Sequence, residues 1–94
     1  MGERIMTLHP NGKQGVNIDK AKYAVIKQAI LASLAEQGEM PFSQLDEAVA
    51  ARLSDPFDGS IGWYTTTVKL DLEARGEIER VPGKSPQVVR LVQK

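Results

Sequence analysis

Carboxylate side chains occur in close pairs along this 94-residue sequence, and paired carboxylates are a common device for general acid–base catalysis. The pairs are Asp46 with Glu47, Asp71 with Glu73, and Glu77 with Glu79. Such catalysis needs a cleft that shields the pair from bulk water, whereas a chain of this length builds one small core. We therefore expect the pairs to be solvated charges on helix and strand surfaces, and the protein not to be an enzyme.

Sites for metals or phosphates have equally little support in the sequence. His9 is the single histidine and cysteine is absent, so the usual ligands of zinc are missing. The segment Gly12-Lys13-Gln14-Gly15 lacks the glycine and Lys-Ser/Thr spacing of a phosphate-binding P-loop, and Asn11-Gly12 predicts a tight turn instead. We expect no metal and no cofactor.

The charge balance gives no evidence for nucleic acid, whose binding depends on neutralising phosphates. Twelve Lys and Arg residues match twelve Asp and Glu residues, so the net charge is zero. Locally, residues 39–58 carry five acids and one base, a balance of −4, and residues 81–94 carry three bases and no acid. The lack of cysteine, of a long apolar run and of a signal-like N-terminus leads us to expect a cytoplasmic protein without a membrane partner.

The sequence divides into an N-terminal arm, residues 1–18, and one domain, residues 19–94. The arm alternates loosely between apolar and polar residues and contains the predicted turn at Asn11-Gly12. A ragged hairpin and an extended tail lying on the core are both consistent with this pattern. The domain begins where the apolar residues change to the period of a helix.

Apolar spacing and capping residues predict two helices in the first part of the domain. The first begins at Asp19 or Asn17 and ends at Gly38, since Asx oxygens cap helix starts and glycine tolerates a left-handed C-terminal residue. The second, of about eleven residues, follows Pro41, with Ser43 and Asp46 resembling a capping box. Their buried stripes are Tyr23, Ile26, Ile30 and Leu34 in the first helix and Leu45, Ala48, Val49 and Leu53 in the second.

A third helix and a hairpin complete the expected fold. Ser60 is the expected N-cap, Arg75 the last helical residue, and Gly76 the terminating residue. The expected inward residues of this helix are Ile61, Tyr64, Thr65, Val68 and Leu72. The segments EIERV and QVVRLV flank the turn residues Val81-Pro82-Gly83-Lys84 and predict two strands. The fold class is therefore α+β, a three-helix core followed by a two-stranded antiparallel β-hairpin.

The junction between the third helix and the hairpin, LEARGEIERVPGKSPQVVRL, resembles that of winged helix-turn-helix domains, and the resemblance covers residues 19–92. The stretch FDGSIGWYTTTVKLDLEARG is also similar to a small bacterial family of uncharacterised winged-helix proteins. The superfamily resemblance implies that the third helix enters the major groove of DNA and that the hairpin, or wing, contacts the backbone. It therefore suggests a small bacterial regulator of transcription that binds double-stranded DNA.

Carried over by position, the resemblance places five residues on the outward side of the third helix: Ser60, Trp63, Thr66, Thr67 and Leu70. For DNA binding we select Ser60, Thr66 and Thr67 for the major groove, and Arg80 and Lys84 for the backbone. This face nevertheless lacks the Arg, Lys, Asn or Gln side chains that usually read base edges. Trp63 and Leu70, seven residues apart, make it partly apolar, which favours an alternative: a protein–protein interaction module that contacts a partner or forms a homodimer.

Overall fold

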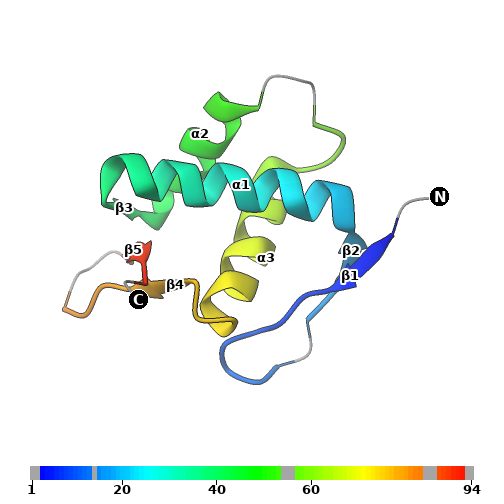
Figure 1. Cartoon of the computed structure of the whole chain (residues 1–94), viewed down its shortest axis with the longest axis horizontal. Coiled ribbons are helices and arrows are strands. Elements are labelled where there is room, and N and C mark those ends of the chain that lie inside the picture. Colours follow the sequence, from blue (N-terminus) through cyan, green and yellow to red (C-terminus); the bar gives the residue numbers. More distant parts are fainter. Residues whose placement is uncertain (1–2, 14, 54–56, 84–86, 93–94) are drawn as a thin grey trace.

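The computed structural model describes residues 3–13, 15–53, 57–83 and 87–92, which form three helices and two small antiparallel sheets (Figure 1). The elements in chain order are β1 (Arg4–Met6), β2 (Asn17–Asp19), α1 (Lys20–Gln37), β3 (Glu39–Pro41), α2 (Phe42–Arg52), α3 (Ile61–Ala74), β4 (Ile78–Arg80) and β5 (Val88–Leu91). The predicted α+β fold class is confirmed. The arrangement is compatible with a winged helix-turn-helix domain.

Helix α1 is the central element and packs against both other helices. It begins as predicted, because the Asp19 side chain accepts a hydrogen bond from the Ala21 amide at 2.8 Å. It ends at Gly38, whose φ of 85° lies in the left-handed region that glycine adopts without strain. The predicted stripe is buried: Tyr23, Ile26, Ile30 and Leu34.

Helix α2 has the predicted length of eleven residues, but it starts differently from our prediction. Pro41 takes the N-cap position, no side chain caps the helix, and Ser43 lies exposed inside the first turn. The Ser43–Asp46 capping box is therefore wrong. The reason is that the chain enters α2 directly from a strand, where the Phe42 amide donates to the Gln87 carbonyl oxygen at 2.8 Å. The buried residues Leu45 and Val49 are as predicted.

Helix α3 begins and ends as the sequence predicts. The Ser60 hydroxyl oxygen accepts from the Trp63 amide at 3.1 Å, Arg75 is the C-cap, and Gly76 follows with a φ of 77°. Thr65, Val68 and Leu72 are buried, and Ile61 and Tyr64 are partly buried against the core. The inward face of this helix is thus confirmed.

The C-terminal sheet contains the predicted hairpin and one strand more. Strands β4 and β5 pair antiparallel, with Ile78 opposite Leu91. Strand β3 pairs with the other side of β5, placing Met40 opposite Val89, so the strand order is β3-β5-β4. The buried side chains Met40, Ile78 and Val89 join this sheet to the helical core.

The N-terminal arm forms a hairpin, which decides between the two interpretations left open by the sequence. Strands β1 and β2 pair antiparallel with Ile5 opposite Ile18, and Ile18 is part of the core. The turn includes Gly12, whose amide donates to the His9 carbonyl oxygen at 3.0 Å. Figure 1 shows this hairpin and the C-terminal sheet at opposite sides of α3.

Candidate functional site

The outward side of α3 carries five residues that the sequence selected: Ser60, Trp63, Thr66, Thr67 and Leu70. We call this set the α3 outer face. Ser60, Trp63 and Thr66 are exposed, while Thr67 and Leu70 are partly buried. The outer face bears no charged side chain, since the set contains only hydroxyl, indole and aliphatic groups.

Trp63 is the largest exposed side chain of this face, with 47% of its surface accessible. Neither the N-terminal hairpin nor the core covers it. Its ring contacts that of Tyr64 edge to face at 5.0 Å, and Tyr64 contacts Phe57 in the same manner at 5.1 Å. The indole therefore packs against Tyr64 on one side and is open to solvent on the other.

The expected positive hairpin is largely neutralised by neighbouring acids. Arg80 Nε lies 3.4 Å from Glu73 Oε2, and Arg90 Nε lies 2.6 Å from Glu79 Oε2. Lys84, the expected wing-tip cation, falls outside the described residues. The described part of the hairpin thus offers little uncompensated charge to a phosphate backbone.

Lys69 belongs to the core and not to the outer face. Its side chain is 3% exposed, and its Nζ donates to Gln87 Oε1 at 2.6 Å. The same Nζ lies 2.8 Å from Glu73 Oε1, an ion pair rather than an aligned hydrogen bond, and 4.5 Å from the centre of the Phe42 ring. This cation joins α3 to the β5 end of the hairpin and to α2.

Asp71 lies on another side of α3 and is completely buried. Its carboxylate accepts hydrogen bonds from the Tyr23 hydroxyl, from the Leu8 amide at 2.9 Å, and from Arg75 Nε at 2.9 and 3.0 Å. Burial and the hydrogen bond to Asp71 raise the pKa of Tyr23, and that same carboxylate raises the pKa of Arg75. Asp71 therefore ties the N-terminal hairpin to α1 and α3.

The expectation that Asp71 and Glu73 are solvated surface charges is wrong. The Glu73 side chain is 7% exposed, because it lies between Lys69, one turn away on α3, and Arg80 of the C-terminal hairpin. Asp71 is inaccessible, because it lies between Arg75, one turn away, and the Leu8 amide of the N-terminal hairpin. Sequence reasoning did not predict the contacts of Lys69 with Glu73 or those of Asp71 with Arg75, although the spacing of these residues indicated them. Lys69 with Glu73 and Asp71 with Arg75 have the i,i+4 spacing of facing side chains, and Asp71 follows the buried Val68 at i+3.

Asp46 has a different environment, close to the start of α3. Its Oδ1 is buried without a hydrogen-bond partner among the described residues, and its Oδ2 lies near Gly62, where an added Cβ would be 3.4 Å away. Burial raises the pKa of Asp46. A carboxylate in this position is less well satisfied than that of Asp71.

The described residues contain no group of three or more His, Asp or Glu side chains that could hold a metal ion. His9 Nδ1 instead accepts from the Asn11 amide at 3.1 Å, within the turn of the N-terminal hairpin. Among the helices of the described ranges, none combines the length and apolar character that crossing a membrane requires.

Comparison with known proteins identifies a family. Residues 4–89 match the family described as "Family of unknown function (DUF6958)", and because the match spans most of the chain, the protein belongs to that family. No curated protein and no solved structure matches the chain. Membership of the winged-helix superfamily therefore stays a prediction with which the fold is compatible.

Proposed function

We propose that this protein is a non-catalytic interaction module that associates with a second copy of itself through the α3 outer face. The observation that carries the proposal is the half-exposed Trp63, anchored by Tyr64 on a helix side that bears no charge. Large aromatic side chains of this kind dominate the binding energy of protein interfaces. Zero net charge favours self-association, because two copies have no overall repulsion to overcome.

The spacing along α3 fits a symmetric contact. Two copies of α3 that cross antiparallel about a twofold axis at Thr66 and Thr67 bring Trp63 of each copy opposite Leu70 of the other. A twofold interface is isologous, so one patch must be complementary to itself, and a bulky and a smaller apolar residue at equal distances from the axis meet this condition. The threonines between them are small enough to let the helices approach.

The charges around α3 support a protein partner over a phosphate backbone. Four cations, Lys69, Arg75, Arg80 and Arg90, lie beside three carboxylates, since Lys69 and Arg80 share Glu73. Nucleic-acid affinity depends on cations that neutralise phosphates and release counterions. Cations already paired within the fold contribute little to that process.

Sedimentation equilibrium over a range of concentrations tests the proposal. Wild type is expected to show a concentration-dependent dimer, and Trp63→Ala or Leu70→Glu to shift the equilibrium to monomer. Val25→Glu is the matched control, because Val25 is an exposed apolar residue on α1, 46% accessible and outside the α3 outer face. A wild type that stays monomeric at millimolar concentration, or a dimer that Leu70→Glu leaves intact, overturns the proposal.

Duplex DNA binding is the second candidate, favoured by two exposed hydroxyl residues: Thr66, on the helix that leads into the hairpin, and Ser60, the N-cap of that helix. Threonine and serine hydroxyls can contact bases or phosphates, and Thr67, Arg80 and Lys84 complete the set selected from the sequence. The test is retardation of a random-sequence duplex at about 50 mM salt, where non-specific affinity is visible. Retardation that weakens in Arg80→Gln and in Thr66→Ala/Thr67→Ala supports this function, and its absence at tens of micromolar protein excludes it.

A further inference from the structure

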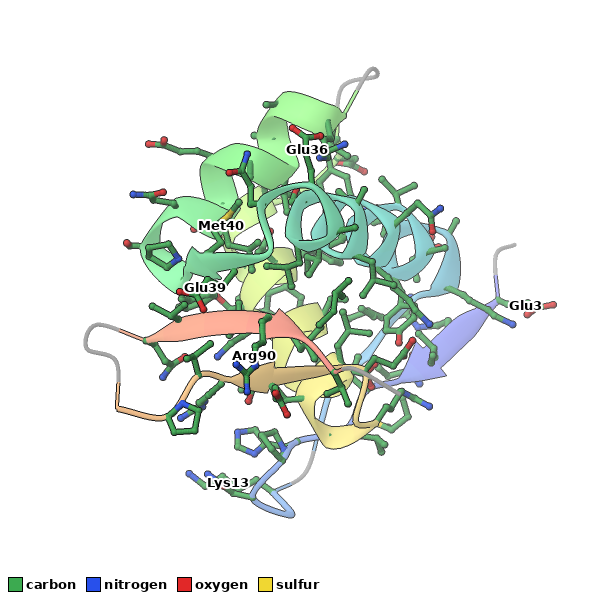
Figure 2. All side chains as sticks on the ribbon, turned by 60° about the vertical axis from the view of Figure 1, so that its left-hand side comes forward. Glu3, Lys13, Glu36, Glu39, Met40 and Arg90 are labelled. Carbon is green, nitrogen blue, oxygen red and sulfur yellow. The ribbon has the colours of Figure 1, made fainter. Side chains whose placement is uncertain are left out.

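The turn of the N-terminal hairpin contains the dipeptide Asn11-Gly12, and both residues are exposed. The backbone reverses between His9 and Gly12, where the Gly12 amide donates to the His9 carbonyl oxygen at 3.0 Å. Figure 2 shows Lys13, the next residue, on a loop at the edge of the molecule. The side-chain amide of Asn11 and the peptide that follows it are therefore open to water.

An asparagine side chain can react with the peptide nitrogen of the next residue. Attack by the Gly12 nitrogen on Asn11 Cγ closes a five-membered ring, and the covalent chain already holds the two atoms close together. The Gly12 nitrogen loses its proton, the bond between Cγ and the side-chain nitrogen breaks, and that nitrogen leaves as ammonia. Water then opens the cyclic imide at one of its two carbonyl groups, which gives aspartate or its β-linked isomer, isoaspartate.

The structure leaves Asn11 free to undergo this reaction. Its side chain has no hydrogen-bond or ion-pair partner among the described residues. A Cβ added at Gly12 would meet nothing within 4 Å, so the attacking nitrogen is not crowded. The restraint that remains is the hydrogen bond from Gly12 to His9, and opening one such bond slows the reaction by no more than about tenfold.

Asn17, the other asparagine of the chain, is held in a different way. It is exposed as well, but its Oδ1 accepts a hydrogen bond from Arg4 Nε, and its carbonyl oxygen accepts from Arg4 Nη2 at 2.7 Å. The next residue, Ile18, pairs with Ile5 in the sheet and is buried in the core. Ring closure at Asn17 would have to disrupt both strand pairing and core packing.

We propose that Asn11 is a site of spontaneous deamidation and that Asn17 is not. The product carries one more negative charge, which takes the net charge of the chain from zero to −1. The chain entering the turn stays anchored, because the Leu8 amide donates to Asp71. The protein thus acquires a second charged form without unfolding. Neither Asn11 nor Gly12 belongs to the α3 outer face, so this reaction is separate from the proposed function.

Incubation of the full chain at mildly alkaline pH, followed by trypsin digestion and mass spectrometry, tests the inference. Cleavage after Arg4, Lys13 and Lys20 places the two asparagines in separate peptides, residues 5–13 and 14–20. Peptide 5–13 is expected to gain the mass difference between an amide and an acid and to separate into aspartate and isoaspartate forms. Peptide 14–20 is expected to keep its mass. Equal conversion of both peptides, or of neither, overturns the inference.

Two further measurements test the part played by the fold. The same incubation in guanidinium chloride gives the rate for the unfolded chain, and the folded rate at Asn11 is expected to lie within about tenfold of it. A larger slowing would mean that the turn protects Asn11 and would overturn the inference. Asn11→Asp, which has the sequence of one product, is expected to unfold at the same temperature as wild type. A lower unfolding temperature would contradict a second charged form that stays folded.

Discussion

The N-terminal and C-terminal hairpins are both attached to α3, but by buried charges of opposite sign. Asp71 holds the N-terminal hairpin by accepting the Leu8 amide hydrogen, whereas Lys69 holds the C-terminal hairpin by donating to Gln87. Asp71 has donors from three directions, and Lys69 has one hydrogen bond, one ion pair and one aromatic ring. The ionisable residues of α3 therefore act inside the fold, and its solvent side is left to hydroxyl and apolar groups.

Replacing Asp71 is expected to have the largest effect. Asp71→Ala leaves the Tyr23 hydroxyl, the Leu8 amide and Arg75 without their acceptor, which should lower the free energy of unfolding by about 3–5 kcal/mol. Urea unfolding measures the loss, and Asp58→Ala, at a fully exposed acid, is the control. Asp71→Asn keeps one acceptor oxygen and should lose less. A cost of Asp71→Ala no greater than that of the control contradicts the anchoring role.

Replacing Lys69 is expected to cost about 2–4 kcal/mol, because Lys69→Met leaves Glu73 nearly buried with Arg80 as its remaining partner. The double variant Lys69→Met/Glu73→Gln should recover part of the loss, since it removes the unpaired charge. A double-mutant cycle from chemical unfolding measures the coupling between the two residues. Strict additivity would mean that the ion pair does not hold the hairpin.

Tyr23→Phe is expected to cost about 1–2 kcal/mol at neutral pH, because one donor to the buried Asp71 is lost. The difference in stability between wild type and Tyr23→Phe is expected to shrink at high pH. Burial and Asp71 raise the pKa of Tyr23 above its unfolded value of 10.0, so the folded state retains the phenolic proton longer. Wild type should therefore lose stability as the pH rises above about 10, and Tyr23→Phe should lose less over the same window. Parallel pH profiles of the two proteins would contradict this assignment.

Asp46→Asn is expected to have the smallest effect, of opposite sign. The buried Oδ1 of Asp46 has no partner in the described structure, and burial raises the pKa of its carboxyl above the unfolded value of 3.8. The folded state then binds the proton more tightly than the unfolded state. Wild type therefore loses stability as the pH rises from the unfolded pKa of Asp46 through its higher folded pKa. Asp46→Asn should be more stable by about 1 kcal/mol or less at pH 7 and no more stable below pH 3.8. Thermal unfolding at both pH values tests this, and a destabilised variant at neutral pH would show that Asp46 is satisfied.

Much of the fold could be predicted from local signals. Asp19, Ser60, Gly38 and Gly76 marked helix ends because capping depends on the residue itself and its immediate neighbours. Strand β3 could not be predicted, since it has three residues, one of them proline, and its partner β5 lies at the far end of the chain. That pairing also displaced the expected cap at Ser43. Long-range pairing overrode the local pattern.

The exposed residues of the candidate site could be predicted from the sequence better than the positions of the charges around it. Helical geometry placed Ser60, Trp63 and Thr66 outward correctly, because the opposite stripe was clearly apolar. The burial of Asp71 and Glu73 was not predicted, since the i,i+4 spacing with Arg75 and Lys69 indicates facing side chains but not that two hairpins fold back onto the flanks of α3. Charges that look like surface residues in a helical pattern became interior ones through those contacts.

The strand order of the C-terminal sheet determines when that sheet can form during synthesis of the chain. Strand β5 lies between β3 and β4 and is the last of the three to leave the ribosome. Until residues 88–91 emerge, neither neighbouring strand has its partner, and the apolar side chains of Met40 and Ile78 lack their cover. The emergence of β5 therefore completes the sheet, and a chain cut before residue 88 would lose both pairings at once.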